Sequence, residues 1–349
     1  MTLDRPGQPD KPDKPGQPAM QPYGPTSEAQ YRSALARTTP EVERVREGVW
    51  AIPLPLPRTG VVESTLCYAL GDASGGVHLV DPGWDTDDNL ARLETALTHA
   101  GFALHDIRST VSTHAHPDHL GLGGRLQRER GVPLALHGSD HWAAGPPDRA
   151  HAEQALQRWG VPTEELEALR AVGQPGSSRP TFEPSVLLSD GDVLDIPGRR
   201  VRVIATPGHT AGSICLLDEG DALLFSGDHV LPIITPGLGL GGFGPEDDPI
   251  GAALDSYERM AAYDEVEVCP GHGYRFRGLA ARAAELARRH RRRREEIAGL
   301  RREHPDASVW EIARRVSWTD GWGGLTPFLR RSALAQTELF LAHLERAGR

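Results

Sequence analysis

Short apolar runs alternate with Gly, Pro and Asp from about residue 45 onward, a pattern that predicts β-strands separated by turns. The predicted strands span residues 49–54, 65–70, 77–80, 107–112, 134–137, 201–205, 213–217, 223–225 and 266–269. Apolar residues at helical spacing predict helices over 87–100, 150–170 and 249–263. Strands mixed with covering helices indicate an α+β fold in which two sheets pack face to face with helices outside.

The composition changes after Tyr274, where Ala, Arg, Glu and Leu recur at helical spacing and the strand patterns end. This stretch predicts a long exposed helix over 278–302, a short one over 308–316 and a last helix that ends near Gly348. Thr326 supplies the N-cap of the last helix and Pro327 its first position. We therefore predict a catalytic domain over residues 41–277 and a small helical domain over residues 278–349.

Residues 1–40 repeat the patterns Pro-Gly-Gln-Pro and Pro-Asp-Lys-Pro. A segment with so few apolar residues cannot offset the entropy lost on ordering, so we predict a disordered and dispensable tail. The segment also lacks the apolar stretch of a secretory signal, and the sequence holds no run of about 18 apolar residues. These features predict a cytoplasmic protein that does not contact a membrane.

Net charge and cysteine content argue against two further classes of protein, general nucleic-acid binders and disulfide-stabilised proteins. The formal net charge of −10 argues against a general nucleic-acid binder. The three cysteines lie far apart in apolar, strand-like stretches, at Cys67, Cys215 and Cys269. An odd, widely spaced set argues against a disulfide framework and suits a reducing compartment. We therefore expect three buried structural thiols.

The densest group of potential metal ligands follows the strand predicted over 107–112. The sequence there is Thr-His-Ala-His-Pro-Asp-His, with ligand side chains at His114, His116, Asp118 and His119. Such crowding at a strand end lets a loop, stiffened by Pro117, fold the ligands around a metal. Imidazole nitrogen and carboxylate oxygen suit zinc or iron. Chance histidines would account for one or two of these residues, but not for all of them in register.

Three single ligand candidates follow three other predicted strands. They are His209 in Pro-Gly-His-Thr, Asp228 in Ser-Gly-Asp-His and His272 in Pro-Gly-His-Gly. Sheet proteins gather their functional sites in the loops just beyond strand ends. One Gly-His or Gly-Asp turn is weak evidence for metal binding. The four motifs together are strong evidence that these residues form one metal centre.

Over roughly residues 45–275 these motifs resemble the metallo-β-lactamase superfamily. The resemblance implies an αββα sandwich with two metal ions at one edge, zinc first and iron or manganese as alternatives. It implies that one ion is held by His114, His116 and His209. It implies that the second is held by Asp118, His119 and His272, with Asp228 as the bridge between the two. By the same resemblance Asp81 orients a ligand, although a plain turn carboxylate before Pro-Gly explains it equally well.

This ligand set implies hydrolysis. Two cations that share an oxygen lower the pKa of bound water enough to supply hydroxide near neutral pH. Asp118 would orient the hydroxide or accept its proton. The leading hypothesis is cleavage of a small ester, thioester or lactone, in the style of the glyoxalase II branch. β-Lactam cleavage is not expected, because members with that activity generally carry Cys or Ser near the position of Asp228.

Two rival functions remain open. The C-terminal helices loosely resemble the winged-helix tail of a branch of the superfamily that includes an endoribonuclease, which makes RNA cleavage the enzyme rival. The other rival is a binding module with an abandoned metal site, which the complete ligand set argues against. The basic run at residues 288–294 is either a solvated helix face paired with Glu285, Glu295 and Glu296 or a nucleic-acid contact.

The residues that contact substrate are harder to predict. A helical insert over 138–184 and the segment 230–244 are expected to set specificity, and the apolar side chains of the second favour a substrate with a hydrophobic part. The segment is either a mobile flap or a plain glycine loop. Candidate pocket residues are His137, His229 and Tyr274. The expected partner is a small-molecule substrate, and the oligomeric state stays open.

Overall fold

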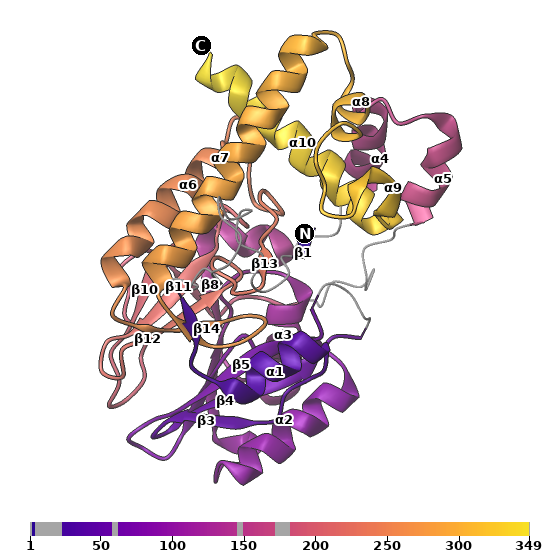
Figure 1. Ribbon diagram of the computed structural model, residues 1–349. Helices are drawn as coiled ribbons and strands as arrows, with labels where there is room; N and C mark the ends of the chain where they lie inside the picture. Colours follow the sequence, from indigo (N-terminus) through magenta and orange to yellow (C-terminus); the bar gives the residue numbers. More distant parts are fainter. Residues whose placement is uncertain (1, 4–22, 58–61, 145–148, 172–181, 349) are drawn as a thin grey trace.

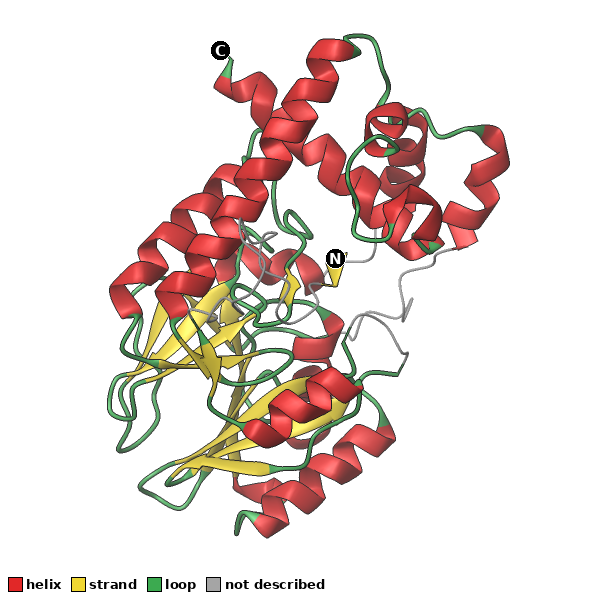
Figure 2. Cartoon of the chain, viewed as in Figure 1, coloured by secondary structure: helices red, strands yellow, loops and turns green. Residues whose placement is uncertain are grey.

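The computed structural model describes residues 2–3, 23–57, 62–144, 149–171 and 182–348. Two β-sheets lie face to face, helices cover both outer faces, and a helical layer stands at one end (Figure 1). Figure 2 shows how the strands gather in the sandwich while the helical layer holds none of them. The predicted fold class, an αββα sandwich with a C-terminal helical region, is confirmed.

The first sheet has seven strands in the order in which they follow one another along the chain. They are β3 (Glu43–Arg46), β4 (Val49–Pro55), β5 (Ser64–Gly71), β6 (Val77–Val80), β7 (Ile107–Val111), β8 (Leu134–His137) and β9 (Val186–Leu188). β3 to β6 pair antiparallel, whereas β6 to β9 pair parallel. The parallel half therefore brings the carboxyl ends of β6, β7 and β8 to one edge of the sheet.

The second sheet has six strands. Their order is β10 (Val201–Ala205), β11 (Ile214–Asp218), β12 (Leu223–Gly227), β14 (Glu267–Pro270), β15 (Phe276–Arg277) and β2 (Gly24–Pro25). β12 and β14 pair parallel, so Gly227 lies opposite Pro270 and the loops that follow these strands start side by side. A separate two-residue ladder joins β1 (Thr2–Leu3) to β13 (Ile234–Thr235).

Apolar side chains from both sheets meet in one core between them, which includes Leu66, Tyr68, Val203, Leu216 and Phe225. On the outer face of the first sheet pack α2 (Asp87–His99) and α3 (Pro117–Arg130). On the outer face of the second pack α6 (Pro249–Met260) and α7 (Leu279–Glu303). Each fully buried Leu or Phe contributes about 1.5–3 kcal/mol relative to an exposed one, so burial in these layers stabilises the packing of the helices on the two sheets.

Helix α3 corrects the expectation of a loop after the first ligand motif. Pro117 was expected to stiffen a loop, but it takes the first position of α3, where its missing N–H costs nothing. The apolar period is hidden because Gly121, Gly123 and Gly124 face the packed side of this helix and leave no side-chain pattern. Asp118 and His119 consequently lie on the first turn of a helix.

The helical layer is assembled from two separate stretches of the chain. The single helix expected over 150–170 is broken at Gly160 (φ 70°) into α4 (Arg149–Arg158) and α5 (Thr163–Ala171). These helices pack against α8 (Val309–Ala313) and α10 (Pro327–Ala347) through a cluster that includes Leu156, Trp159, Trp310 and Leu334. The short helix α9 (Gly321–Gly324) joins the same layer. Within the described part of the chain, no strand follows Arg277, so the helical layer there carries no wing.

The expected disorder of the N-terminal tail is wrong for its second half, while residues 4–22 lie outside the described residues. Helix α1 (Glu28–Ala36) begins at Ser27, whose hydroxyl accepts the backbone N–H of Gln30. The ring of Tyr31 meets Tyr274 edge to face at 5.1 Å between centroids. The low apolar content misled the prediction because a few aromatic contacts to the sandwich are enough to hold the segment.

The predicted character of the cysteines is confirmed, because Cys67, Cys215 and Cys269 are free and fully buried. Burial raises the pKa of all three thiols, which keeps them protonated and unreactive. Among the described residues, no helix is both long and apolar enough to cross a bilayer.

The contact of α1 with the sandwich predicts a measurable loss of stability. Tyr31→Ala removes the edge-to-face partner of the buried Tyr274 and should lower the free energy of unfolding by about 2 kcal/mol in a urea titration. Leu35 lies on the same helix with half of its surface exposed, so Leu35→Ala should change stability by less than about 0.5 kcal/mol. Equal stabilities for the two variants would contradict the docking of α1.

Candidate metal centre

The loops that carry the four motifs meet at one edge of the sandwich. His114 and His116 follow β7, and Asp118 and His119 begin α3. His209 lies in the turn between β10 and β11. Asp228 and His272 follow β12 and β14, whose parallel pairing places their carboxyl ends next to each other. The structure therefore brings together all seven residues that the sequence predicted as metal ligands.

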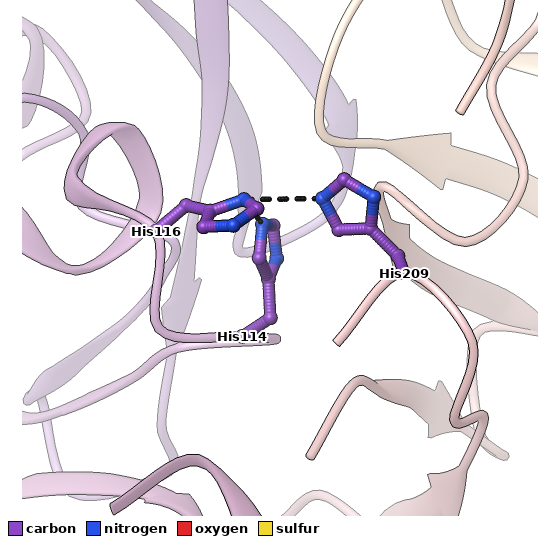
Figure 3. A group of neighbouring side chains, drawn as sticks. All are labelled: His114, His116 and His209. Carbon is purple, nitrogen blue, oxygen red and sulfur yellow. Dashed lines mark hydrogen bonds between the residues drawn. The ribbon is translucent and has the colours of Figure 1, made fainter. Parts of the chain in front are cut away.

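Three imidazoles form the first group of this centre (Figure 3). Nε2 of His114 lies 2.9 Å from Nδ1 of His116, and Nε2 of His209 lies 3.1 Å from the same Nδ1 atom. Nitrogens that bind one tetrahedral zinc at about 2.0–2.1 Å lie roughly 3.3 Å from one another. The spacing in this group is close to what a single shared cation requires.

A second group consists of Asp118, His119 and His272. The Nε2 atoms of the two imidazoles are 3.3 Å apart. Oδ2 of Asp118 lies 3.4 Å from Nε2 of His272 and 3.8 Å from Nε2 of His119. This group offers two nitrogens and one oxygen to a second cation, and the side chain of Asp118 is the more open of the three at 20% exposure.

Asp228 lies between the two groups. Its Oδ1 atom is 3.4 Å from Nε2 of both His119 and His272, and its Oδ2 atom is 3.6 Å from Nε2 of His209. The residue is 3% exposed, and Oδ1 has no hydrogen-bond partner in the described parts of the chain. An unpaired buried carboxylate oxygen is costly unless a cation or a donor meets it. The donor set thus fits two divalent cations with Asp228 between them.

Hydrogen bonds on the far side of four imidazole rings determine which nitrogen faces the centre. Nδ1–H of His209 donates to the Gly237 carbonyl at 2.6 Å, and Nδ1–H of His272 donates to the Ser64 carbonyl at 2.8 Å. Nδ1–H of His119 donates to Asp81 at 2.9 Å, and Nε2–H of His116 donates to the Leu240 carbonyl at 3.3 Å. A carbonyl or carboxylate oxygen can only accept, so each ring, in the neutral form that binds a metal, turns a lone pair toward the centre.

His114 follows the same rule through Thr113. The Thr113 hydroxyl donates to Oδ2 of Asp81 at 2.8 Å, so its oxygen is left to accept from Nδ1–H of His114 at 3.2 Å. Asp81 also accepts the backbone N–H of Thr113 at 2.7 Å and holds a left-handed backbone (φ 50°), which Asp tolerates better than most residues. Asp81 therefore lies where the predicted orienting role requires it.

The two groups differ in electrostatics. Burial, together with the neighbouring imidazoles, holds the pKa of His114 well below its usual range and lowers that of His209 to about 4. Burial also disfavours a charged His119, but the carboxylates of Asp81, Asp228 and Asp118 outweigh it and raise its pKa to about 10. The first group is thus a set of neutral donors, whereas the second is a carboxylate-rich pocket that favours positive charge.

Two glycines leave room for this arrangement. A Cβ on Gly271 would lie 2.6 Å from the His119 ring and 2.9 Å from Oδ1 of Asp228. Gly227, just before Asp228, has φ 48°, and a Cβ there would lie 2.2 Å from Oγ1 of Thr113. Gly271 is therefore required by close approach of the backbone to two candidate ligands, and Gly227 by its positive φ and close approach to Thr113.

Sequence reasoning missed one buried residue of the centre, Asp140. Its Oδ2 atom accepts the backbone N–H of Ala115 at 2.8 Å and the hydroxyl of Thr210 at 2.9 Å. Its Oδ1 atom accepts the backbone N–H of Gly212 at 2.9 Å. Asp140 thus ties the loop of His114 and His116 to the loop of His209. No spacing rule marks it, because an isolated Asp in a predicted insert has no pattern.

The candidate pocket residues occupy different places. Tyr274 is 1% exposed and packs on Tyr31, and His229 is buried with its ring stacked on Tyr257 at 4.8 Å. Both expectations of a substrate contact are therefore wrong, because these rings pack in the core. His137 is half-buried, and its Nδ1 accepts the backbone N–H of Ser139, so a substrate contact there stays a prediction.

The segment 230–244 borders the centre through its backbone, since Gly237 and Leu240 accept from His209 and His116. Its apolar side chains are buried in the core, namely Val230, Leu231, Ile233, Ile234 and Leu238. The expectation of a hydrophobic substrate part rested on these side chains lining a pocket, and that basis is wrong.

The family model of the metallo-beta-lactamase superfamily matches residues 60–272. This range is more than half of the chain and includes all seven candidate ligands. The chain belongs to this superfamily. The metallo-beta-lactamase family protein TTHA1429 from Thermus thermophilus is 28% identical, with a TM-score of 0.70 over 87% of this chain and 95% of that one. A beta-lactamase domain protein from Burkholderia ambifaria, 24% identical, shares the fold with a TM-score of 0.71 over 99% of this chain and 92% of that one.

Curated relatives of this superfamily member match shorter stretches. The uncharacterized protein ML0493 of Mycobacterium leprae (strain TN) is 30% identical over 155 residues, which are 43% of this chain and 60% of that protein. The acyl-coenzyme A thioesterase MBLAC2 of Bos taurus is 35% identical over 111 residues, or 30% of this chain and 35% of that protein. The chain thus spans between about a third and three fifths of the length of these relatives.

Asp140 provides a test of how this metallo-beta-lactamase centre is held. Asp140→Asn keeps the size but turns amide hydrogens toward the N–H groups of Ala115 or Gly212, so it should loosen both ligand loops. The affinity for zinc, measured by competition with a chromogenic chelator, should fall about 10–100-fold.

Asp190→Asn is the matched control, since Asp190 is exposed and, as far as the described residues show, accepts one hydrogen bond, from the N–H of Ala205 at the end of β10. Its zinc affinity should equal that of the unmodified protein. Unchanged zinc affinity in Asp140→Asn, with the fold intact by circular dichroism, would show that Asp140 does not position the ligands.

Proposed function

We propose that this protein is a dinuclear metal-dependent hydrolase that cleaves a small ester, thioester or lactone. The observation that carries the proposal is the place of Asp228, whose two oxygens face two different groups of ligands while Oδ1 has no partner within the described residues. A site for one ion would not need a buried carboxylate turned toward both groups.

We assign His114, His116 and His209 to one ion, Asp118, His119 and His272 to the other, and Asp228 to both. Zinc is the first choice for such nitrogen and oxygen donors, with iron and manganese as alternatives. When bound, two divalent cations supply Lewis acidity, which lowers the pKa of water and polarises the scissile carbonyl.

Asp118 is the residue that we assign to proton handling. Burial works against its charged form, but the neighbouring imidazoles, His119 first, hold the pKa of its carboxyl well below the usual range. It is therefore ionised at neutral pH and can accept a hydrogen bond from water through a carboxylate oxygen. Its partial exposure makes it accessible from outside, whereas Asp228 is closed off.

A thioester is the substrate class that we favour among the three. Relatives named acyl-coenzyme A thioesterase MBLAC2 from Bos taurus and Homo sapiens are 35% and 34% identical over 111 residues. Thioester cleavage also needs fewer catalytic groups, because the thiolate leaving group departs without protonation near neutral pH. No residue of the centre then needs to act as a general acid.

RNA cleavage has less support from the structure. The helical layer shows no wing in the described part of the chain, and the basic run contacts acidic partners. Arg289 pairs with Glu285, Arg291 with Glu258, and Arg293 lies 3.6 Å from Glu296. These pairs reduce the positive charge that the run presents to an extended phosphate backbone.

A substrate panel tests the proposal. The zinc-loaded protein should hydrolyse short acyl thioesters faster than oxygen esters, lactones or a cephalosporin, as followed by thiol release and by absorbance. Asp228→Asn should lower turnover by orders of magnitude, because the change weakens both ion sites at once.

The control is Asp255→Asn, which removes an exposed carboxylate on α6 and should leave turnover unchanged. Thioester hydrolysis that persists in Asp228→Asn with both ions retained would contradict the bridging role. If protein that carries two ions hydrolyses no member of the panel, the proposed substrate class is contradicted.

A further inference from the structure

A cavity of about 570 Å³ lies between α7, α10 and the segment that leads into the metal centre. α7 and α10 cross above β13 in Figure 1, and the cavity is lined from both helices and from residues 235–237, which contain the end of β13. The residues 317–319 between α8 and α9 close another side. Its volume is in the range that small-molecule sites occupy, roughly 300–1,000 Å³.

One wall of the cavity is cationic. Arg289, Arg292 and Arg293 of α7 line it, and two carboxylates offset part of their charge: Glu296 among the lining residues and Glu285, which pairs with Arg289. The protein as a whole carries a formal charge of −10, so the local excess of positive charge runs against the average. A concave cationic wall raises the local concentration of small anions.

Two polar atoms of this wall have no partner in the described structure, Nη1 of Arg293 and Nε2 of His290. His290 is 5% exposed, and burial lowers its pKa to about 4, so its ring is neutral. The ring is packed between Tyr257 and Phe340. Buried polar atoms without partners are destabilising, and a ligand in this cavity would supply hydrogen bonds to both.

The part of the lining that comes mainly from α10 is mostly apolar. Leu325, Leu329, Ala333 and Phe340 line it, the last three from α10. Trp318 adds an aromatic ring, and the Arg293 guanidinium lies over this ring at 4.3 Å from its centroid. The ligand that fits both walls is therefore an anion with an apolar or aromatic body.

A short chain of hydrogen bonds connects the cavity to the metal centre. Gly237 lines the cavity, and its carbonyl accepts from the ring of His209. Gln336 lines it as well, and its side chain holds both the N–H (3.1 Å) and the carbonyl (2.6 Å) of Leu238. The segment between cavity and centre is thus clamped on both sides.

We propose that this cavity binds an organic phosphate of about the size of a nucleotide. The phosphate lies against Arg292 and Arg293, since phosphate geometry matches the guanidinium fork. The remainder of the ligand packs on Leu329 and Phe340. This site goes beyond the proposed hydrolysis and does not depend on it, because none of the seven candidate metal ligands lines the cavity.

Calorimetric titration of the zinc-loaded protein with ADP tests the site. ADP should bind, and inorganic phosphate and adenosine should each bind more weakly, because each reaches only one wall. Arg292→Gln should weaken ADP binding about tenfold or more, the loss expected for one charge-assisted contact. Arg292 is exposed at the rim, so the substitution should leave the melting temperature unchanged.

Arg288→Gln is the matched control, because Arg288 is exposed on the same helix but does not line the cavity. Its ADP affinity should match that of the unmodified protein. Leu329→Trp provides a second variant, which fills the apolar side and should abolish ADP binding while the metal content stays constant.

Three results would overturn the proposal. The first is no heat of ADP binding at millimolar concentration. The second is ADP binding that is lost in Asp228→Asn but kept in Arg292→Gln and Leu329→Trp, which would place the nucleotide on the metal ions. The third is an oligoribonucleotide that binds far more tightly than ADP with a steep salt dependence, which would identify a nucleic-acid surface instead.

Discussion

The carboxylate of Asp228 lies buried between two groups of imidazole rings, and Oδ1 has no hydrogen-bond partner among the described residues. The surrounding structure serves to hold this arrangement together. Parallel pairing of β12 and β14 places Asp228 next to His272, and parallel pairing of β6 and β7 places Asp81 next to Thr113. Protein oxygens accept hydrogen bonds from the outer N–H groups of the rings, so each ring directs its other nitrogen inward. These nitrogens and the carboxylates together favour positive charge at the centre.

Much of this centre could be predicted from sequence, because its ligands are encoded by local rules. Each of the four motifs follows an apolar run and contains Gly or Pro, which bends the backbone at the strand end. Long-range contacts escaped prediction. Asp140 joins loops that are 25 and about 70 residues away, and no periodicity marks it. Helix α1 depends on Tyr274, and α3 was hidden by its buried glycines.

His229 and Tyr274 were placed near substrate by sequence proximity, although strand ends turn neighbouring side chains in different directions.

The helical layer is more than an appendage to the sandwich. Helices α4 and α5 from the insert pack with α8 and α10 from the C-terminal stretch, so one small core combines two distant segments. From this layer Gln336 reaches Leu238, whose neighbour Gly237 holds His209. The position of one candidate metal ligand, His209, is therefore connected to the packing of α10. Local pattern alone left the basic run on α7 open between a solvated face and a nucleic-acid contact. In the structure its arginines form ion pairs, and Arg289, Arg292 and Arg293 also line the cavity.

The most direct test of the dinuclear centre is anomalous X-ray diffraction from crystals of the zinc-loaded protein, recorded on both sides of the zinc absorption edge. Two anomalous peaks are expected about 3.5–4 Å apart, one on each side of the Asp228 carboxylate. One peak should lie among His114, His116 and His209, and the other among Asp118, His119 and His272. A single peak, or two peaks neither of which contacts Asp228, would contradict the dinuclear centre on which the proposed hydrolysis depends.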